Sequence, residues 1–568
     1  MSDEEVTLSA IMLHRVLPSW SVRLALLLAV ALVACGNPNI TALDPATGPV
    51  RTLVRVNGST VFATVLWDAG TASEVAIPGG FLGASMFSVP GSAALGGHAV
   101  QLRRGTATGN TETFTVTAAT PFGAPRLDRV SLAGAQFQAG NQVSVWLLVQ
   151  GANVDVGAEV LVDGVVQPTA AVKALRNELF GVAPNTLGNP LYHHLALIAA
   201  PGPRPNGSAI TVTIRNLDGM TSSPLVYTLP ASAATMDSDG DDLPDDWERN
   251  GYDANGDGTI DVDLPGLGAN PHRPDVLLEV DIMQGLGNHP APDAFQAMQD
   301  AYAAAPYINL IAQNGINLII DTTGTVPFWQ TIDMTGADNP AAGFANFYTL
   351  KTANFDNANR GRLYYYCIWA NARPNGSSGL SDPTSNGIDF TGPGDDCIVS
   401  FDDFSAPYQT ARTGAETLMH EVGHDFQQRH GGGTHFTLNP TYNSVMSYSW
   451  QLRSGRTNAT RLARPVCVPF YYGQTGAVET NGALPAVVGN VIDYSDGMGA
   501  DLNEASLNEP NGVCNTVAVD WNGDGAATGA AVAVDLNGNG VTTDVWSDYA
   551  NWAKLVFGGP RLNGANGN

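Results

Sequence analysis

The most informative stretch of this sequence is His420-Glu421-Val422-Gly423-His424, which is followed by a further histidine at His430. Apolar residues recur at helical intervals from Ala415 to Phe426, and Thr413 to Glu416 has the form of a capping box, so we expect a helix over 413–428. Residues four apart on a helix face the same way. His420 and His424 can therefore bind one metal ion, with Glu421 turned toward a water molecule on that ion.

The third ligand is expected to be His430, because the chain can end the helix near Gln427 and turn back. The set His420, Glu421, His424 and His430 resembles the zinc-binding motif of the metzincin clan of zinc peptidases. Gln427 departs from that motif, which has glycine at the helix end. We expect Gln427 to adopt a left-handed conformation, at a cost on the order of 1 kcal/mol. Histidines that merely pack in a core are the alternative interpretation.

A second feature of the same clan follows at Asn443 to Tyr448. The resemblance implies that Met446 packs beneath the imidazoles as an apolar floor, and that Tyr448 stabilises the oxyanion. It covers roughly residues 265–557 and implies an α+β metzincin-like catalytic domain, in which His289 and His435 are bystanders. Apolar runs predict strands at 276–282, 316–320, 363–369 and 397–401, and a second helix at 293–304.

Three neutral imidazoles leave the zinc ion with its full charge and an open position for water, whose pKa then falls toward 7. Glu421 is the expected general base. The sequence thus predicts a zinc metalloendopeptidase that hydrolyses protein or peptide substrates through a Glu-activated zinc-bound water. A catalytically weak or inactive surface adhesin on the same scaffold is the alternative, and hydrolysis of a non-peptide amide or ester would use the same chemistry.

An Asp-rich segment, 232–264, precedes this domain. Oxygen-bearing side chains occupy positions 1, 3, 5, 9 and 12 of a twelve-residue loop that starts at Asp237, which is calcium-loop spacing. Asp242 stands where an EF-hand has glycine. Shorter loops at 253–261, 520–525 and 535–540 repeat the pattern, and turns without a metal are the alternative. The expected calcium ligands are Asp237, Asp239, Asp241, Leu243 (through its carbonyl), Asp245 and Glu248, then Asp253, Asn255, Asp257 and Asp261.

Residues 35–120 and 121–231 contain short runs of β-formers, separated by turn residues about every ten positions. This spacing predicts two all-β immunoglobulin-like sandwiches in front of the catalytic domain. The segment 149–164 is similar to the TIG family of immunoglobulin-like modules. That resemblance implies a spacer or binding role.

The first 34 residues read as an export signal, with an apolar run at Leu24–Val33 after Arg15 and Arg23. Leu32-Val33-Ala34-Cys35 resembles the lipobox of bacterial lipoproteins. The resemblance implies a lipid on Cys35 and a place at the bacterial outer membrane or cell surface, with release from the cell as a further outcome. An ordinary signal peptide is the alternative.

The formal net charge is -27, which argues against a nucleic-acid partner because binding phosphates needs Lys and Arg. Contact with a membrane is expected only through the lipid on Cys35. The four other cysteines predict two disulfides, for which three connectivities exist. Proximity favours Cys367 with Cys397 and Cys467 with Cys514. We expect residues 558–568 to form a disordered tail.

Overall fold

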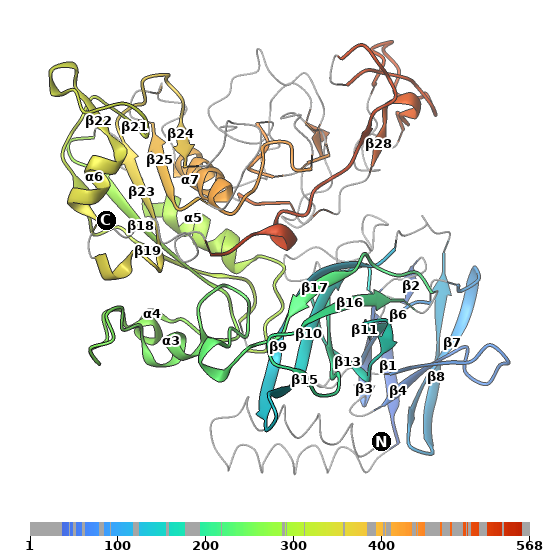
Figure 1. Cartoon of the computed structure of the whole chain (residues 1–568). Coiled ribbons are helices and arrows are strands. Elements are labelled where there is room, and N and C mark those ends of the chain that lie inside the picture. The colour runs from blue at the N-terminus through green and yellow to red at the C-terminus, as the bar shows by residue number, and fades with distance from the viewer. Residues whose placement is uncertain are drawn as a thin grey trace. The chain divides into compact units, whose positions relative to one another are not determined.

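The computed structural model describes residues 37–558 with gaps, of which the longest are 176–193, 383–393, 449–465, 468–477, 480–491 and 511–519. The export signal, Cys35, His289, His435 and residues 559–568 lie outside the described residues. The chain divides into two compact units: Met1–Asp239 with Tyr307–Gln313, and Gly240–Pro306 with Asn314–Asn568. It is a mostly β, multidomain protein with several sheets and few helices (Figure 1). Within the described part, no helix has the length and apolarity needed to cross a membrane.

The first unit begins with two sheets that enclose a core around Trp67. Side chains alternate along each strand, so one row of each sheet is buried, as the pattern of β7 shows. Trp67 lies 5.8 Å from Phe87 and 5.9 Å from Phe114, measured between ring centroids. One sheet has the order β1-β3-β6 and the other β2-β8-β7-β4-β5. Their bounds are β1 Asn39–Asp44, β2 Thr47–Gly48, β3 Leu53–Ser59, β4 Thr64–Trp67, β5 Val75–Pro78, β6 Ser85–Ser88, β7 Gly96–Arg104 and β8 Ala107–Val116.

Two further sheets of the same unit enclose a second core. Val145 and Leu147 of β10 and Val212 of β16 belong to this core and are almost completely buried. Each pair of sheets has its own core, which is consistent with β-sandwich modules. The first sheet contains β9 Arg126–Gln138, β10 Gln142–Ala152, β13 Thr169–Leu175, β14 His194–Ala199 and β15 Arg204–Pro205, and the second contains β11 Glu159–Val162, β12 Val165–Val166, β16 Ala209–Arg215 and β17 Leu225–Thr228.

The second unit is built on a six-stranded mixed sheet of order β19-β18-β23-β25-β24, in which β20 also pairs with β18. The strands β18 Asp275–Met283, β19 Asn317–Asp321, β23 Tyr364–Ala370 and β25 Asp396–Ser400 run parallel, and β20 Thr325–Val326 is also parallel to β18. The edge strand β24, Gly379–Ser381, is antiparallel to β25. All seven residues of β23 are buried, as in a sheet covered on both faces. The four strands expected from the apolar runs are present.

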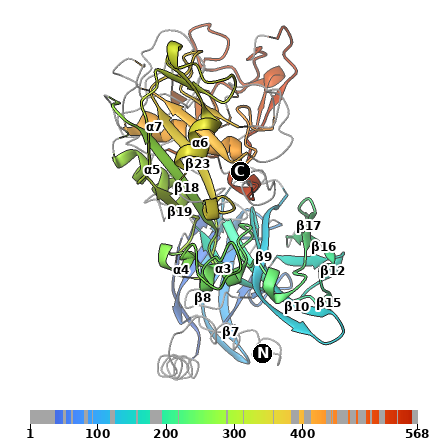
Figure 2. The ribbon, with the colours of Figure 1, turned by 60° about the vertical axis from the view of Figure 1, so that its left-hand side comes forward.

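Helices cover both faces of this sheet. Adjacent residues on a strand point to opposite faces. On β23 the ring of Tyr365 meets Phe426, just after α7 (Ala411–Asp425), while Tyr366 meets Phe347 of α6 (Phe347–Asn354). Helix α5, Pro292–Ala303, packs beside α7 (Figure 2). Both helices expected from the sequence are therefore present, and α6 was not expected.

The capping box expected at Thr413 is wrong. Helix α7 begins at Ala411, so Thr413 lies inside the first turn. Thr413 and Glu416 are both buried. They face the protein interior instead of capping a helix end exposed to water.

The disulfide between Cys367 and Cys397 is confirmed. The two residues are register partners on the neighbouring strands β23 and β25, with Cα atoms 4.4 Å apart. Cys514 and the side chain of Cys467 lie outside the described residues.

The remaining elements are short. They are the helices α3 Asp245–Asn250 and α4 Leu264–Leu267, the strands β21 Thr331–Asp333, β22 Phe344–Asn346, β26 Val466–Cys467, β27 Val478–Glu479, β28 Leu502–Asn503 and β29 Val545–Trp546, and the 3-10 turns η2 Ala233–Thr235, η3 Pro340–Ala342, η4 Ala358–Arg360, η8 Glu504–Ser506 and η9 Trp552–Lys554.

Candidate metal centre

Three imidazoles converge at the C-terminal half of α7. The Nε2 atom of His424 lies 3.2 Å from that of His420 and 3.0 Å from that of His430, and the third side of the triangle is 3.1 Å. Zinc binds imidazole nitrogen at about 2.0–2.1 Å, so a tetrahedral site places two such nitrogens about 3.3 Å apart. The three histidines therefore have a spacing that fits one zinc ion.

The end of α7 brings His430 back to the other two histidines. Gln427 has φ 63°, the left-handed conformation expected for it. The N–H of Gln427 donates to the carbonyl of His424, and the N–H of Gln428 donates to that of Gly423, each at 2.8 Å. These bonds close the helix as a glycine-type C-cap would. Six residues after His424, the chain can thus present a third imidazole on the same side.

Backbone carbonyls fix the orientation of the two helical histidines. Nδ1 of His420 lies 2.8 Å from the carbonyl oxygen of Val445, and Nδ1 of His424 lies 2.8 Å from that of Gln428. A carbonyl only accepts, so each Nδ1 carries the proton and each Nε2 presents a lone pair. Burial lowers the pKa of His424 to about 3 and that of His430 to about 4, and it lowers the pKa of His420 well below its ordinary value. All three imidazoles are therefore neutral at neutral pH.

Met446 and Tyr448 lie beside the histidines. Met446 is fully buried, and a Cβ placed on Gly423 would lie 2.4 Å from its sulfur. The thioether therefore packs directly against α7 at Gly423, the residue before His424. The ring of Tyr448 lies 4.3 Å from that of His430. The ring of Tyr448 therefore packs against the histidine cluster.

Glu421 is buried against the edge strand. A Cβ on Gly379 would lie 2.4 Å from Oε1 of Glu421. Burial raises the pKa of Glu421 to about 8, and the guanidinium of Arg373 opposes that rise. Arg373 donates to the carbonyl of Gly379 at 3.0 Å and to Asp333 at 2.7 Å. Sequence reasoning missed Arg373 and Gly379, because no motif or spacing links either one to α7.

The C-terminal segment holds the end of α7 in place. The buried amide of Gln428 donates to the carbonyl of Lys554 at 2.8 Å and accepts from Asn551 at 2.9 Å. The hydroxyl of Tyr494 donates to the carbonyl of Met419. These contacts fix the segment that links His424 to His430.

The first Asp-rich loop is divided between the two units, with the boundary after Asp239. In the first unit Asp237 is half-buried and Asp239 is buried. In the second unit, carboxylate oxygens of Asp241, Glu248 and Asp275 lie within 4.8 Å of one another, and all three residues are buried. Asp275, at the start of β18, was not expected from the loop pattern.

Asp242, Asp245 and Leu243 of this loop have distinct local environments. Asp242 has φ 72°, so the position that is glycine in an EF-hand is left-handed here too. Asp245 forms an ion pair with Arg249 at 2.7 Å and is not among the three converging acids. The side chain of Leu243 is buried, and its N–H donates to Asp241 at 2.7 Å.

In the second loop, residues 253–261, the side-chain oxygens accept hydrogen bonds from backbone N–H groups. Asp253 accepts from Gly256 and Gly258 at 2.7 Å each, Asn255 accepts from Asp257, and Asp261 accepts from Ala254. Asp520 and Asp535 make the same bonds to Gly525 and Gly540. These are Asx-type turns. Among the described residues, the carboxylates of these loops do not converge as those of Asp241, Glu248 and Asp275 do.

Comparison with protein-family models finds no match, and comparison with curated proteins finds none. Among solved structures the chain is similar to SGBP-B from a complex xyloglucan utilization locus in Bacteroides uniformis, with 14% identity and a TM-score of 0.13. The match covers 34% of this chain and 50% of that one, so the chain spans about half the length of that protein. At this TM-score the likeness carries no argument about function.

Proposed function

We propose that this chain is a zinc-dependent endopeptidase whose catalytic domain, about residues 265–557, is of the metzincin type. One observation carries the proposal: three neutral imidazole nitrogens lie within 3.2 Å of one another, next to a buried glutamate on the same helix. That donor set fits zinc, and three protein ligands leave one tetrahedral position for water or substrate.

Zinc held by His420, His424 and His430 would supply a Lewis acid that polarises a peptide carbonyl and acidifies water. Glu421 would take the proton of the attacking water and pass it to the departing amine. Burial raises the pKa of Glu421 to about 8, and the positive charge of a bound zinc ion would favour the ionised form that accepts a proton. The hydroxyl of Tyr448 would donate to the negative oxygen that develops on the carbonyl.

The test is Glu421→Gln in the full chain, assayed for zinc content and for cleavage of an unstructured protein substrate. We expect about one zinc per chain and a loss of turnover of at least about 1000-fold, since general-base catalysis contributes up to about 10⁴-fold. Glu74→Gln, on the exposed surface of the first unit, is the control and should keep full activity. Wild-type protein that binds zinc but cleaves no peptide bond would support an inactive adhesin or a non-peptide amide or ester hydrolase instead.

We further propose that Asp241, Glu248 and Asp275 hold a structural calcium ion. Three buried carboxylates with oxygens within 4.8 Å of one another form a donor set that suits a hard cation. Desolvation raises the pKa of Asp275 to about 6, and a bound cation would offset the cost of burying its charged form. Calcium removal, with zinc replenished, should lower Tm, and the lowering should be smaller in Asp275→Asn. An equal response in both proteins would exclude this site.

Attachment through a lipid on Cys35 completes the proposed location, at the bacterial outer membrane or cell surface. It is supported by the four residues that end at Cys35. Metabolic labelling with a fatty acid should mark the wild-type chain and leave Cys35→Ser unlabelled. Equal labelling of both would contradict the anchor.

A further inference from the structure

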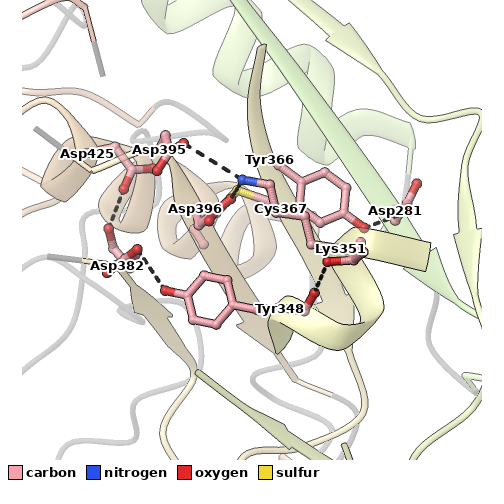
Figure 3. A network of polar contacts seen from close by, with 12 residues as sticks. Asp281, Tyr348, Lys351, Tyr366, Cys367, Asp382, Asp395, Asp396 and Asp425 are labelled. Carbon is pink, nitrogen blue, oxygen red and sulfur yellow. Dashed lines mark hydrogen bonds and ion pairs between the residues drawn. A yellow bond between two sulfur atoms is a disulfide. The ribbon is translucent and has the colours of Figure 1, made fainter. Parts of the chain in front are cut away.

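Three aspartates meet where the edge strand leaves the sheet. Asp382 directly follows β24, and Asp395 and Asp396 stand at the start of β25, with one carboxylate oxygen of each within 4.8 Å of the others (Figure 3). The N–H of Asp382 donates to the carbonyl of Asp396 at 2.8 Å, so these two residues are neighbours across the ladder. Like charges at such positions destabilise a sheet. The cluster therefore needs positive charge.

Helix α6 supplies one positive charge and one hydrogen-bond donor to the three aspartates. Nζ of Lys351 lies 2.6 Å from Asp396 and 3.7 Å from Asp395, and the hydroxyl of Tyr348 donates to Asp382 at 2.7 Å (Figure 3). The lysine contributes a single positive charge against three carboxylates. A negative charge of about two remains on the three aspartates in their ionised form.

A fourth carboxylate, that of Asp425 at the end of α7, lies beside the cluster. Asp425 is fully buried, and its Oδ1 accepts from the hydroxyl of Ser381. A Cβ on Gly394 would lie 2.7 Å from the same oxygen. Ser381 and Gly394 directly precede Asp382 and Asp395, so the Asp425 carboxyl group adjoins the cluster. Its second oxygen, Oδ2, is buried and has no hydrogen-bond partner among the described residues.

We propose that Asp382, Asp395 and Asp396 bind a calcium ion, beside the buried carboxyl group of Asp425. Calcium binds carboxylate oxygen at about 2.3–2.6 Å, so two of its ligand oxygens lie at most about 5 Å apart, and the observed limit of 4.8 Å satisfies this. Donors that are all oxygen select a hard cation. Calcium fits better than magnesium because it tolerates an irregular set of ligands.

The position of this site suggests that the ion has a structural role. It would join the end of β24, the start of β25 and the end of α7. The same edge strand contains Gly379, which lies against Glu421, and the same helix contains His420 and His424. The ion would therefore hold the edge strand in a fixed position relative to the metal centre. It is separate from the Asp241, Glu248 and Asp275 group, and it does not depend on the proposed peptidase activity.

The experiment counts calcium in the full chain at fixed free calcium, with zinc present, by elemental analysis after gel filtration. Asp382→Asn and Asp395→Asn should each lose one calcium per chain relative to wild type, with zinc content unchanged. Asp300→Asn, an exposed aspartate on α5, is the matched control and should lose none. Equal calcium content in wild type and both cluster variants would overturn the proposal.

Lys351→Met tests the site without removing a ligand. Loss of the competing positive charge should strengthen calcium binding at the cluster by about tenfold or more, because two unit charges this close interact by more than about 1.4 kcal/mol at a protein surface. The calcium concentration at the midpoint of the rise in Tm should fall accordingly. A midpoint equal to or above that of wild type would show that Lys351 alone neutralises the aspartates, and would also overturn the proposal.

Discussion

Oε1 of Glu421 lies so close to Gly379 that a Cβ at position 379 would be 2.4 Å from it. The two residues belong to different elements, since Glu421 is on α7 and Gly379 begins the edge strand β24. The edge strand thus packs directly against the side chain of the proposed general base. A side chain at this point would have to displace either the strand or the carboxylate.

Gly379→Ala should reduce kcat/KM by about 100-fold, because a displacement of about 1 Å in a catalytic group costs this much. Zinc content should stay at the wild-type value, since the atoms nearest an added Cβ all belong to Glu421. Gly202→Ala, where an added Cβ would meet nothing within 4 Å, is the control. Wild-type kinetics in Gly379→Ala would mean that Glu421 does not need its present position.

Tyr448→Phe should lower kcat by about 10- to 100-fold and leave KM nearly unchanged, because its hydroxyl would act only on charge that develops in the transition state. The ring contact with His430 is retained in phenylalanine, so zinc should remain bound. Steady-state kinetics with a single peptide separate the two constants. Tyr307→Phe in the first unit provides the comparison, and a rise in KM alone would assign Tyr448 to substrate binding.

Two adjacent glutamines should respond in opposite ways. Gln427→Gly should raise the free energy of unfolding by about 1 kcal/mol, because glycine adopts φ 63° without a clash. Gln428→Ala should lower it by about 1–3 kcal/mol, because it leaves the Lys554 carbonyl and the Asn551 amide without their partner. Urea unfolding measures both. If Gln427→Gly destabilises the protein, its side chain makes a contact that outweighs the backbone strain.

In the zinc-free protein His430 should make stability depend on pH. Its pKa is about 4 when folded and 6.5 when unfolded, so the unfolded chain binds more protons between these values. Stability from this residue is therefore lost as pH falls from 6.5 to about 4, at up to about 1.4 kcal/mol per pH unit. The free energy of unfolding of wild type minus that of His430→Asn should therefore decrease as the pH is lowered from 6.5 to about 4. A constant difference would mean that His430 is not buried as described.

Local sequence patterns were sufficient to predict the parts of the site that are formed by residues close together in the chain. The spacing of His420 and His424 is the helical repeat, so their shared face follows from the positions alone. The left-handed conformation of Gln427 followed from the need to turn back toward His430. The capping box was wrong because α7 begins at Ala411, before Thr413, and the four-residue pattern does not reveal that Thr413 and Glu416 are buried.

Calcium-loop spacing predicted Asp241, Asp245 and Glu248 as ligands. The structure brings Asp241 and Glu248 together with Asp275, whereas Asp245 pairs with Arg249. Asp275 lies beyond the loop and joins its acids because β18 begins beside them, with the Asp275 N–H donating to Asp241 at 2.6 Å. Position within a loop restricts which residues can be ligands. The direction in which each carboxylate points is decided by what packs around it.

The sequence by itself determined the helix, the three imidazoles, the glutamate between them and the Cys367–Cys397 pair as the favoured disulfide. Only the tertiary structure placed Gly379 and Arg373 against Glu421, and Asp382 beside Asp395 and Asp396. The physical reason is that side-chain direction within one helix is set by a fixed repeat, whereas strand order and register depend on burial summed over the whole sheet. No regular sequence spacing links residues that only this packing brings together, so the sequence alone could not predict that they are neighbours.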